Sequence, residues 1–177
     1  MGSEYHKPGK ATMRTGLPVS PWLERRLGPR LKAVALQVEG RVVGDIGSDH
    51  GYLPAFLLRA GWADKVIVVE KNSGPLALAR HNLRRVNADV RGGDGLSPIA
   101  PGELDCLCMS GFGGALMESI LLAHPERIPG RLVLQPNDNP ILLRRWAQAH
   151  GFRVTAESLV ESYLILTFQR LVVLGPS

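Results

Sequence analysis

The stretch that most constrains this chain is residues 41–52, where an apolar run ends in an acid and glycines follow. Its apolar residues predict a strand over 41–46, in which Asp45 comes before Gly47 and Gly51. A loop that cradles a pyrophosphate has instead the order G-x-G-x-x-G, with its first glycine directly after the strand. The order here is D-x-G-x-D-x-G, with Asp49 between the two glycines. The sequence therefore predicts a strand end that presents carboxylates rather than a phosphate-binding loop.

Taken alone, this loop has two interpretations. In the first, Gly47 lets the backbone approach a ligand, because glycine has no Cβ and adopts positive φ readily. Asp45 would then accept a hydrogen bond from the ammonium group of an amino-acid-like ligand. In the second, the loop is an ordinary turn between a strand and a helix, where Asp and Gly are common. Residues at the ends of the later strands distinguish the two interpretations.

Strands and helices alternate from Arg41 onward, which predicts crossover connections and a largely parallel sheet. The fold class is therefore α/β, with helices on both faces of the sheet and an antiparallel hairpin at the C-terminal end. A short helix starting at Ser20-Pro21 precedes this region, and Gly28-Pro29 interrupts it. The predicted strands are 41–46, 65–70, 89–91, 104–109 and 131–135, the helices are 54–60, 75–86, 114–123 and 141–150, and the hairpin strands are 153–160 and 163–171.

Chain length and charge indicate the number of domains and the type of partner. The 177 residues suit one domain, which we expect over residues 20–177 after a flexible basic arm over 1–19. The net charge of +5 favours a polyanionic partner only weakly. No apolar signal core or membrane-length segment is present, so a cytoplasmic location is the default expectation. Cys106 and Cys108 lie two residues apart in a predicted strand and are expected to be buried thiols, and no metal site is expected.

Further acids and glycines fall at the ends of the later strands. Glu70 closes the second strand, where a carboxylate can accept both hydroxyl protons of a ribose or can simply cap the next helix. Asp94, in Gly93-Asp94-Gly95, can accept from an adenine amino group or belong to a plain turn. A glycine-rich loop, Ser110–Gly114, follows the fourth strand, and Gln135-Pro-Asn-Asp138 follows the fifth. Together, in order along one sheet edge, these positions predict a site for a nucleoside-containing cofactor.

These motifs resemble those of a known family. D-I-G-S-D-H-G-Y-L-P, G-D-G-L, G-F-G-G-A-L-M and L-V-L-Q-P-N are similar to segments of the TrmK-type bacterial tRNA methyltransferases. The similarity extends from about Leu27, through R-L-K-A-V-A, to the last strand. That family uses S-adenosyl-L-methionine (SAM) to methylate N1 of the adenine at position 22 of tRNA. The resemblance implies a class I methyltransferase fold, SAM as cofactor and tRNA as partner.

The resemblance also implies roles for residues of this chain. Asp49 would face the methyl-transfer site, as a catalytic carboxylate that stabilises the cationic product base or only as a cofactor ligand. Arg25, Arg26, Arg30 and Lys32 lie on or beside the first helices and form either a solvated face or a phosphate-contacting face. The implied cofactor-binding residues are Asp45, Gly47, Asp49, Glu70, Asp94, Gly95 and Gly111, and the implied substrate-binding ones are Gly111, Gly113, Gly114, Gln135, Pro136 and Asn137. Their charge and their position just before the first loop add Arg25, Arg26 and Arg30 as candidate substrate-binding residues.

Two departures from the family pattern leave other functions open. Phe112 stands where the family loop usually has Met, and the sequence stops at Ser177 without the helical C-terminal extension that is usual in the family. We therefore keep two alternatives: a SAM-dependent methyltransferase of another RNA or of a small substrate, and a non-catalytic RNA-binding relative. No N-P-P-Y-type motif, Walker loop or dinucleotide-binding loop supports a different enzyme class.

Overall fold

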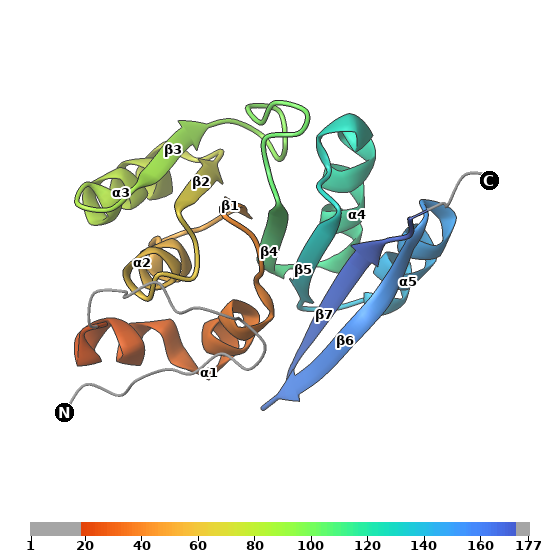
Figure 1. The fold of residues 1–177 in the computed structure, drawn as a ribbon, viewed down its shortest axis with the longest axis horizontal. Helices are drawn as coiled ribbons and strands as arrows, with labels where there is room; N and C mark the ends of the chain where they lie inside the picture. The colour runs from red at the N-terminus through yellow and green to blue at the C-terminus, as the bar shows by residue number, and fades with distance from the viewer. Residues whose placement is uncertain (1–18, 173–177) are drawn as a thin grey trace.

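The computed structural model describes residues 19–172, which form one seven-stranded sheet with helices packed on it (Figure 1). The strand order is β3-β2-β1-β4-β5-β7-β6, in which β1 to β5 are parallel and β7 pairs antiparallel with both β5 and β6. This confirms the predicted fold class. The elements are α1 (Pro21–Gln37), β1 (Val42–Ile46), α2 (Tyr52–Arg59), β2 (Lys65–Glu70), α3 (Ser73–Leu83), β3 (Ala88–Gly92), β4 (Cys106–Phe112), α4 (Gly114–Ala123), the 3-10 turn η1 (Pro125–Arg127), β5 (Arg131–Pro136), α5 (Pro140–Ala149), β6 (Phe152–Val160) and β7 (Tyr163–Arg170).

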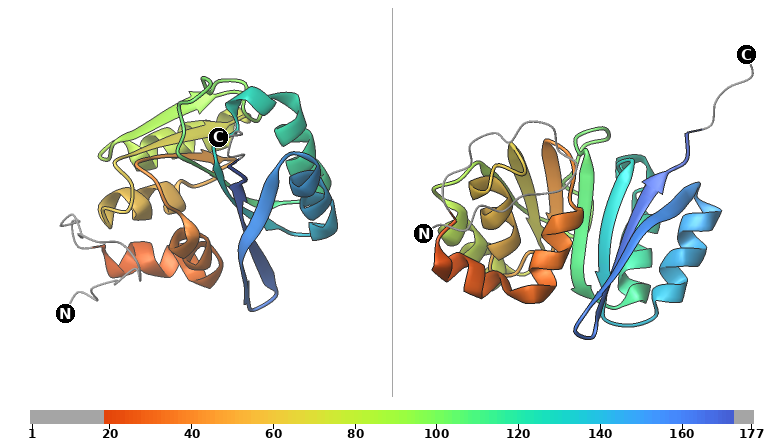
Figure 2. Two further views of the ribbon diagram at one scale, coloured as in Figure 1. Left: turned by 45° about the vertical axis from the view of Figure 1, so that its right-hand side comes forward. Right: turned by 60° about the horizontal axis from the view of Figure 1, so that its bottom comes forward.

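The buried strands have apolar side chains on both faces, as expected for a parallel sheet that is covered by helices on both sides. In β2, Val66 and Val68 pack against a core that includes residues of α1, α2 and α3. Ile67 and Val69 point to the opposite face, into a core shared with α4 and α5. Figure 2 shows these helices on either side of the sheet. Burial of each such side chain stabilises the fold by about 1.5–3 kcal/mol, so the sheet is a rigid base for its loops.

The first helix is broken where the sequence predicts it. Ser20 caps it by accepting a hydrogen bond from the Leu23 amide at 3.3 Å, and Pro21 occupies the first turn. Gly28 then leaves the helical conformation, with φ 66° and ψ 171°, and Pro29 starts a second helical segment. The break changes the direction of the chain, so that Arg30 reaches the ends of β4 and β5. The arm predicted over residues 1–19 lies, apart from Val19, outside the described residues.

The fourth strand is longer at its end than predicted. Its pairing with β5 continues to Phe112, opposite Pro136, with an irregularity between Ser110 and Phe112. The prediction of a flexible loop starting at Ser110 is therefore wrong for residues 110–112, whose backbone is held in the sheet. Cys106 and Cys108 are both buried in this strand, as expected.

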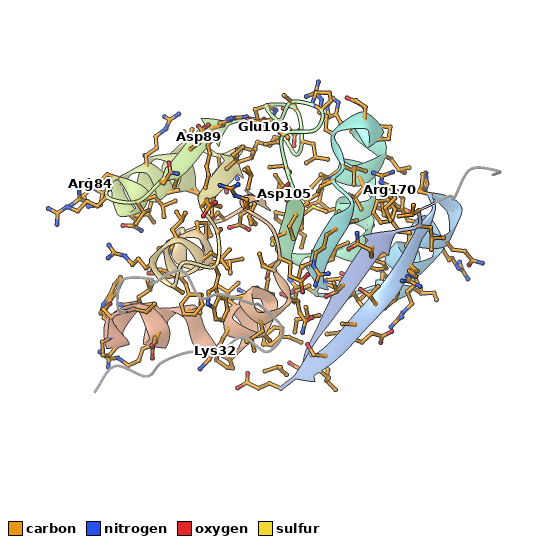
Figure 3. The ribbon with its side chains drawn as sticks, viewed as in Figure 1. Lys32, Arg84, Asp89, Glu103, Asp105 and Arg170 are labelled. Atoms are coloured by element: carbon orange, nitrogen blue, oxygen red, sulfur yellow. The ribbon has the colours of Figure 1, made fainter. Side chains whose placement is uncertain are left out.

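An ion-pair cluster closes the side of the sheet near β3. Arg91 contacts Glu103 at 2.6 Å and Asp89 at 2.7 Å. Asp89 and Glu103 are labelled on this side of the sheet in Figure 3. The hydrogen bonds from Arg91 lower the pKa of Glu103 to about 2. The cluster therefore ties the long connection between β3 and β4 to the sheet edge. Within residues 19–172, no helix is both long and apolar enough to cross a bilayer.

Candidate functional site

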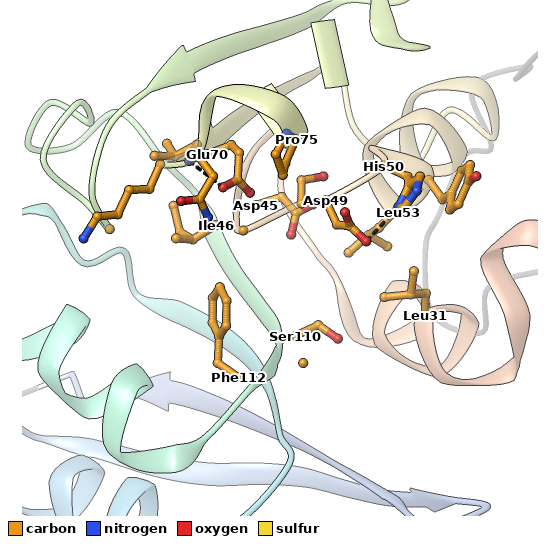
Figure 4. A pocket seen from close by; sticks show the side chains of 18 of the residues that line it. Leu31, Asp45, Ile46, Asp49, His50, Leu53, Glu70, Pro75, Ser110 and Phe112 are labelled. Atoms are coloured by element: carbon orange, nitrogen blue, oxygen red, sulfur yellow. Dashed lines mark hydrogen bonds and ion pairs between the residues drawn. The ribbon is translucent and has the colours of Figure 1, made fainter. Parts of the chain in front are cut away.

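A pocket of about 680 Å³ opens at the carboxyl ends of the strands β1, β2 and β4. Helix α1 and the turns after β1, β2 and β3 complete its wall, and Figure 4 shows the side chains that line it. This volume is in the range of small-molecule and cofactor sites. Ligands of open α/β sheets bind at this edge, in the crevice beside the central strands. The first loop that the sequence singled out lies in this wall.

Asp45 and Gly47 form the part of the pocket nearest the sheet. Asp45 is 4% exposed and Gly47 has φ +70°, and the Gly47 amide donates to the Val69 carbonyl at 2.8 Å. A Cβ added to Gly47 would lie 2.0 Å from Cζ of Phe112, whose ring packs on the glycine. Position 47 therefore requires glycine for two reasons, the backbone conformation and the contact with this ring.

Burial also changes the acidity of Asp45. It raises the pKa of the Asp45 carboxyl from 3.8 to about 6, and the Glu70 carboxylate adds to the increase. Ser48 and the Arg30 guanidinium act in the opposite direction and lower the pKa of Asp45. At neutral pH the carboxylate is thus charged in a site that solvates it poorly. Such a group gains most from a cationic partner.

Glu70 is the second buried acid of the pocket. Its side chain is 7% exposed, and its Oε1 accepts a hydrogen bond from the Asn72 amide at 2.9 Å. Within residues 19–172, Oε2 of Glu70 has no hydrogen-bond partner. The carboxylate is therefore held in one orientation by the backbone and keeps acceptor capacity toward the pocket, which suits a ligand with vicinal hydroxyl groups.

Asp94 and Gly95 lie farther out, on the turn after β3. Asp94 is 70% exposed and pairs with Lys71 through Oδ2 at 2.8 Å. Gly95 has φ +55°, and a Cβ there would lie 3.1 Å from the Ile120 side chain. The turn is thus packed closely against α4, with one carboxylate at the outer rim of the pocket.

Asp49 lines the same pocket at its opposite end, beside α2. It has φ 52°, and its Oδ2 lies 2.7 Å from Nδ1 of His50 (Figure 4). Its side chain is 69% exposed, so the carboxylate faces the open mouth rather than the interior. The neighbouring imidazole fixes one oxygen and leaves the other available.

Arg30 lies in the pocket wall and makes three contacts there. Its Nη1 donates to the Ser110 hydroxyl and, at 2.9 Å, to Oε1 of Gln135, and its guanidinium lies over the Tyr163 ring at 5.6 Å. These contacts hold the guanidinium against the ends of β4 and β5. Arg25 and Arg26 are exposed on α1, and of the two only Arg26 lines the pocket.

The remaining predicted substrate residues do not line the pocket. Gln135 is fully buried, and its Nε2 donates to the Pro136 carbonyl at 3.0 Å. Asn137 donates from Nδ2 to the Gly111 carbonyl at 2.7 Å and from its amide to the Phe112 carbonyl at 2.7 Å. These bonds brace the part of β4 that forms the pocket floor. The predicted residues outside the lining are Gly113, Gly114, Gln135, Pro136, Asn137 and Arg25.

Several residues of the pocket lining were not predicted from the sequence. Tyr52 stacks on His50 with ring centroids 5.3 Å apart, and the buried Ser48 hydroxyl lies beside the Asp45 carboxyl, whose pKa it lowers. Ser48 belongs to the D-x-G-x-D loop, and this position could have predicted that it lines the pocket. The turn after β2 adds Lys71 and Asn72, whose only sequence signal was their position directly after a strand-end acid.

The donor set of this pocket suits an organic, nucleoside-like ligand. Buried carboxylates and close-packed glycines are features of sites that bind hydroxyl and ammonium groups. Residues 19–172 hold no group of three His, Cys, Asp or Glu side chains placed to bind a metal ion. The ordered acids Asp45, Glu70 and Asp94 therefore match the cofactor type that the sequence predicted.

Comparison with known proteins supports this interpretation. A family model described as a methyltransferase domain matches residues 27–166. The chain is 36% identical over 145 residues to the tRNA (adenine(22)-N(1))-methyltransferase of Bacillus subtilis (strain 168), a match covering 78% of this chain. It spans 61% of the length of that relative.

Solved structures give the same result. The crystal structure of the B. subtilis M1A22 tRNA methyltransferase TrmK is similar with a TM-score of 0.76 and 33% identity, over 80% of this chain and 65% of that one. Streptococcus pneumoniae Sp1610, solved in complex with SAM, is similar with a TM-score of 0.75 and 32% identity, over 84% of this chain and 76% of that one.

Proposed function

Because this chain belongs to the TrmK family of methyltransferases, we propose that it transfers a methyl group from SAM to N1 of an adenine in tRNA. One observation carries the proposal: Asp45, Glu70 and Asp94 follow one another at the ends of three strands around a pocket of about 680 Å³. The similarity to relatives that act on adenine 22 of tRNA supports the same position here. A tRNA substrate agrees with the predicted cytoplasmic location.

The acids divide the recognition of the cofactor among them. Asp45, buried and charged at neutral pH, would accept hydrogen bonds from the amino-acid ammonium group. Glu70, held by the Asn72 amide, would accept from the ribose hydroxyls, and Asp94 from the adenine amine. Gly47 and Gly95 would let the backbone approach the ligand. When bound, SAM supplies an electrophilic methyl group on a sulfonium sulfur.

The target adenine needs no base to activate it. Its N1 carries an in-plane lone pair, so orienting the base toward the methyl group accounts for much of the rate enhancement. The base becomes cationic as the bond to N1 forms. Asp49 lies at the pocket mouth with one oxygen fixed by His50, and its carboxylate would stabilise that charge. The Phe112 ring, packed on Gly47, would form an apolar side of the base site.

The test is methyl transfer to unmodified tRNA with labelled SAM, followed by nucleoside analysis. We expect label in N1-methyladenosine from tRNA and none in free adenosine. The matched variant Asp49→Asn keeps the side-chain size and removes the charge, and its turnover should fall on the order of 100-fold. Label in another nucleoside only would refute the adenine-N1 assignment, and absence of SAM binding by the folded chain would refute methyl transfer altogether.

A further inference from the structure

Four side chains form a connected aromatic and cationic cluster at the mouth of the pocket. Trp22 meets Tyr52 edge to face, with centroids 6.0 Å apart and an interplanar angle of 80°. Tyr52 stacks on His50 with an interplanar angle of 10°, and the Arg26 guanidinium lies 5.7 Å from the centre of the Trp22 ring. Three of the four, namely Arg26, His50 and Tyr52, line the pocket. The cluster is therefore continuous with the candidate methyl-transfer site.

The exposure of Trp22 is not explained by the packing of α1. This helix buries Leu23 and Leu27 against the core, at 4% and 3% exposure, whereas Trp22 on the neighbouring side is 53% exposed. The other two tryptophans, Trp62 and Trp146, are 7% and 3% exposed. A large half-exposed aromatic side chain beside a functional pocket marks a contact surface rather than a core position.

The charges around the cluster select the type of partner. Arg25 and Arg26 are both exposed on the same turn of α1, and the structure gives no ion pair for either within residues 19–172. Asp49, next to His50 in the sequence, is paired with His50, and Glu24 on the same turn as the two arginines has its own partner. Aromatic faces next to exposed guanidinium groups complement an unpaired base and its phosphate.

We propose that Trp22, with Tyr52 and His50, stacks an unpaired nucleotide next to the target adenine, while Arg25 and Arg26 contact the backbone phosphates. An adenine N1 that is to be methylated has to leave base pairing, and extruding it costs stacking energy. Stacking on the protein at the pocket mouth replaces part of the base stacking that the RNA loses. The inference rests on the proposed function, since it takes the methyl acceptor to be RNA, but its test is a binding measurement.

Tryptophan fluorescence gives a direct test, because Trp62 and Trp146 are buried and Trp22 is not. The probe is an unstructured oligoadenylate of about five nucleotides, within the length that single-strand sites span. We expect it to quench the emission of the wild-type chain and to leave Trp22→Phe unquenched. Trp22→Ala should bind roughly 5- to 150-fold more weakly, the range of one lost base stack.

Two control variants separate stacking and charge from general surface effects. Leu171→Ala removes an apolar side chain that is 49% exposed just after β7, at the sheet edge opposite the pocket, and Arg153→Ala removes one positive charge from β6 at the same edge. Both should bind the probe like the wild type, whereas Arg26→Ala should bind more weakly and with a smaller salt dependence. Calorimetry with S-adenosylhomocysteine should give the wild-type affinity for Trp22→Ala.

The outcomes distinguish this inference from the proposed function. Wild-type affinity of Trp22→Ala for the probe, or emission that stays constant at saturation, would overturn the stacking surface even if N1-methyladenosine is formed. Quenching that depends on Trp22 would support the surface even if tRNA is not methylated, and the proposed reaction would then be the one that fails.

Discussion

Asp45→Asn is expected to stabilise the ligand-free protein while weakening its affinity for SAM. Burial raises the pKa of Asp45 from 3.8 to about 6, so the native state binds a proton that the unfolded chain has already lost between these two pH values. Stability therefore falls as the pH rises from about 4 to about 6, and the loss is complete above that range. The variant has no such proton to lose, and its stability should be flat over this window.

The magnitude follows from the two pKa values. A difference between 3.8 and about 6 corresponds to about 3 kcal/mol of unfolding free energy at pH 8. For a domain of this size, that amounts to a rise in melting temperature of roughly 6–12 °C. At pH 4 both proteins should melt at the same temperature. Glu161→Gln, an equal change of charge at an exposed hairpin position, should match the wild type at both pH values.

Calorimetry should show the opposite effect on ligand binding. The charged carboxylate is the form that binds an ammonium group, and losing such a charge-assisted hydrogen bond costs about 1.5–3 kcal/mol. SAM affinity of the wild type should accordingly increase as the pH rises through about 6, and that of Asp45→Asn should not. The variant could instead be no more stable than the wild type at pH 8 and show the same change of stability between pH 4 and 6. This result would refute the argument that the charged Asp45 carboxylate destabilises the folded protein.

Three further changes test other parts of the site. Gly47→Ala should lower both the melting temperature and SAM affinity, because its Cβ would lie 2.0 Å from Phe112; adding Phe112→Ala should recover the steric part but not the roughly 1–2 kcal/mol of backbone strain. Arg30→Met should cost about 1–3 kcal/mol in urea unfolding, because it removes the hydrogen bonds that the guanidinium donates to Ser110 and Gln135 and leaves only the one from Ser110 to Gln135 at 3.1 Å. Unchanged stability with weaker tRNA binding would instead favour the phosphate-contacting role. Arg91→Met should remove the stability that the wild type loses in acid between pH 4.5 and about 2, the range set by the lowered pKa of Glu103, and an unchanged acid transition would contradict this.

The strand-end acids could be predicted because their positions depend on local patterns alone. An apolar run of five or six residues fixes where a strand ends, and the ends of parallel strands meet at one edge of the sheet. Asp45, Glu70 and Asp94 therefore had to lie along the same edge once the strands were identified. The break at Gly28-Pro29 was equally local, since both residues disrupt a helix whatever surrounds them.

The direction of side chains at that edge depends on tertiary contacts and could not be predicted in the same way. Gln135 follows the same sheet edge as the acids, yet its amide is saturated by Arg30 and Pro136. Arg30 is directed into the wall only because the kinked helix crosses β4 and β5. The end of β4 was misjudged because glycines at 111, 113 and 114 predict a loop, whereas pairing with β5 keeps residues 110–112 in the strand.

The distribution of charge assigns the two proposed ligands, SAM and an RNA, to different parts of one site. The chain has a net charge of +5, yet the two buried charged groups of the pocket, Asp45 and Glu70, are both acids, whereas its cations Arg26 and Lys71 lie farther out. The buried carboxylates attract a ligand with ammonium and sulfonium groups and would repel the phosphates of an RNA. An RNA can bring a base into this pocket only if its backbone stays outside and meets positive charge there. Arg26, which lines the pocket with its guanidinium over the Trp22 ring, and Arg25, exposed on the same turn of α1, supply that charge. Added salt should therefore weaken RNA binding far more than it weakens binding of the cofactor.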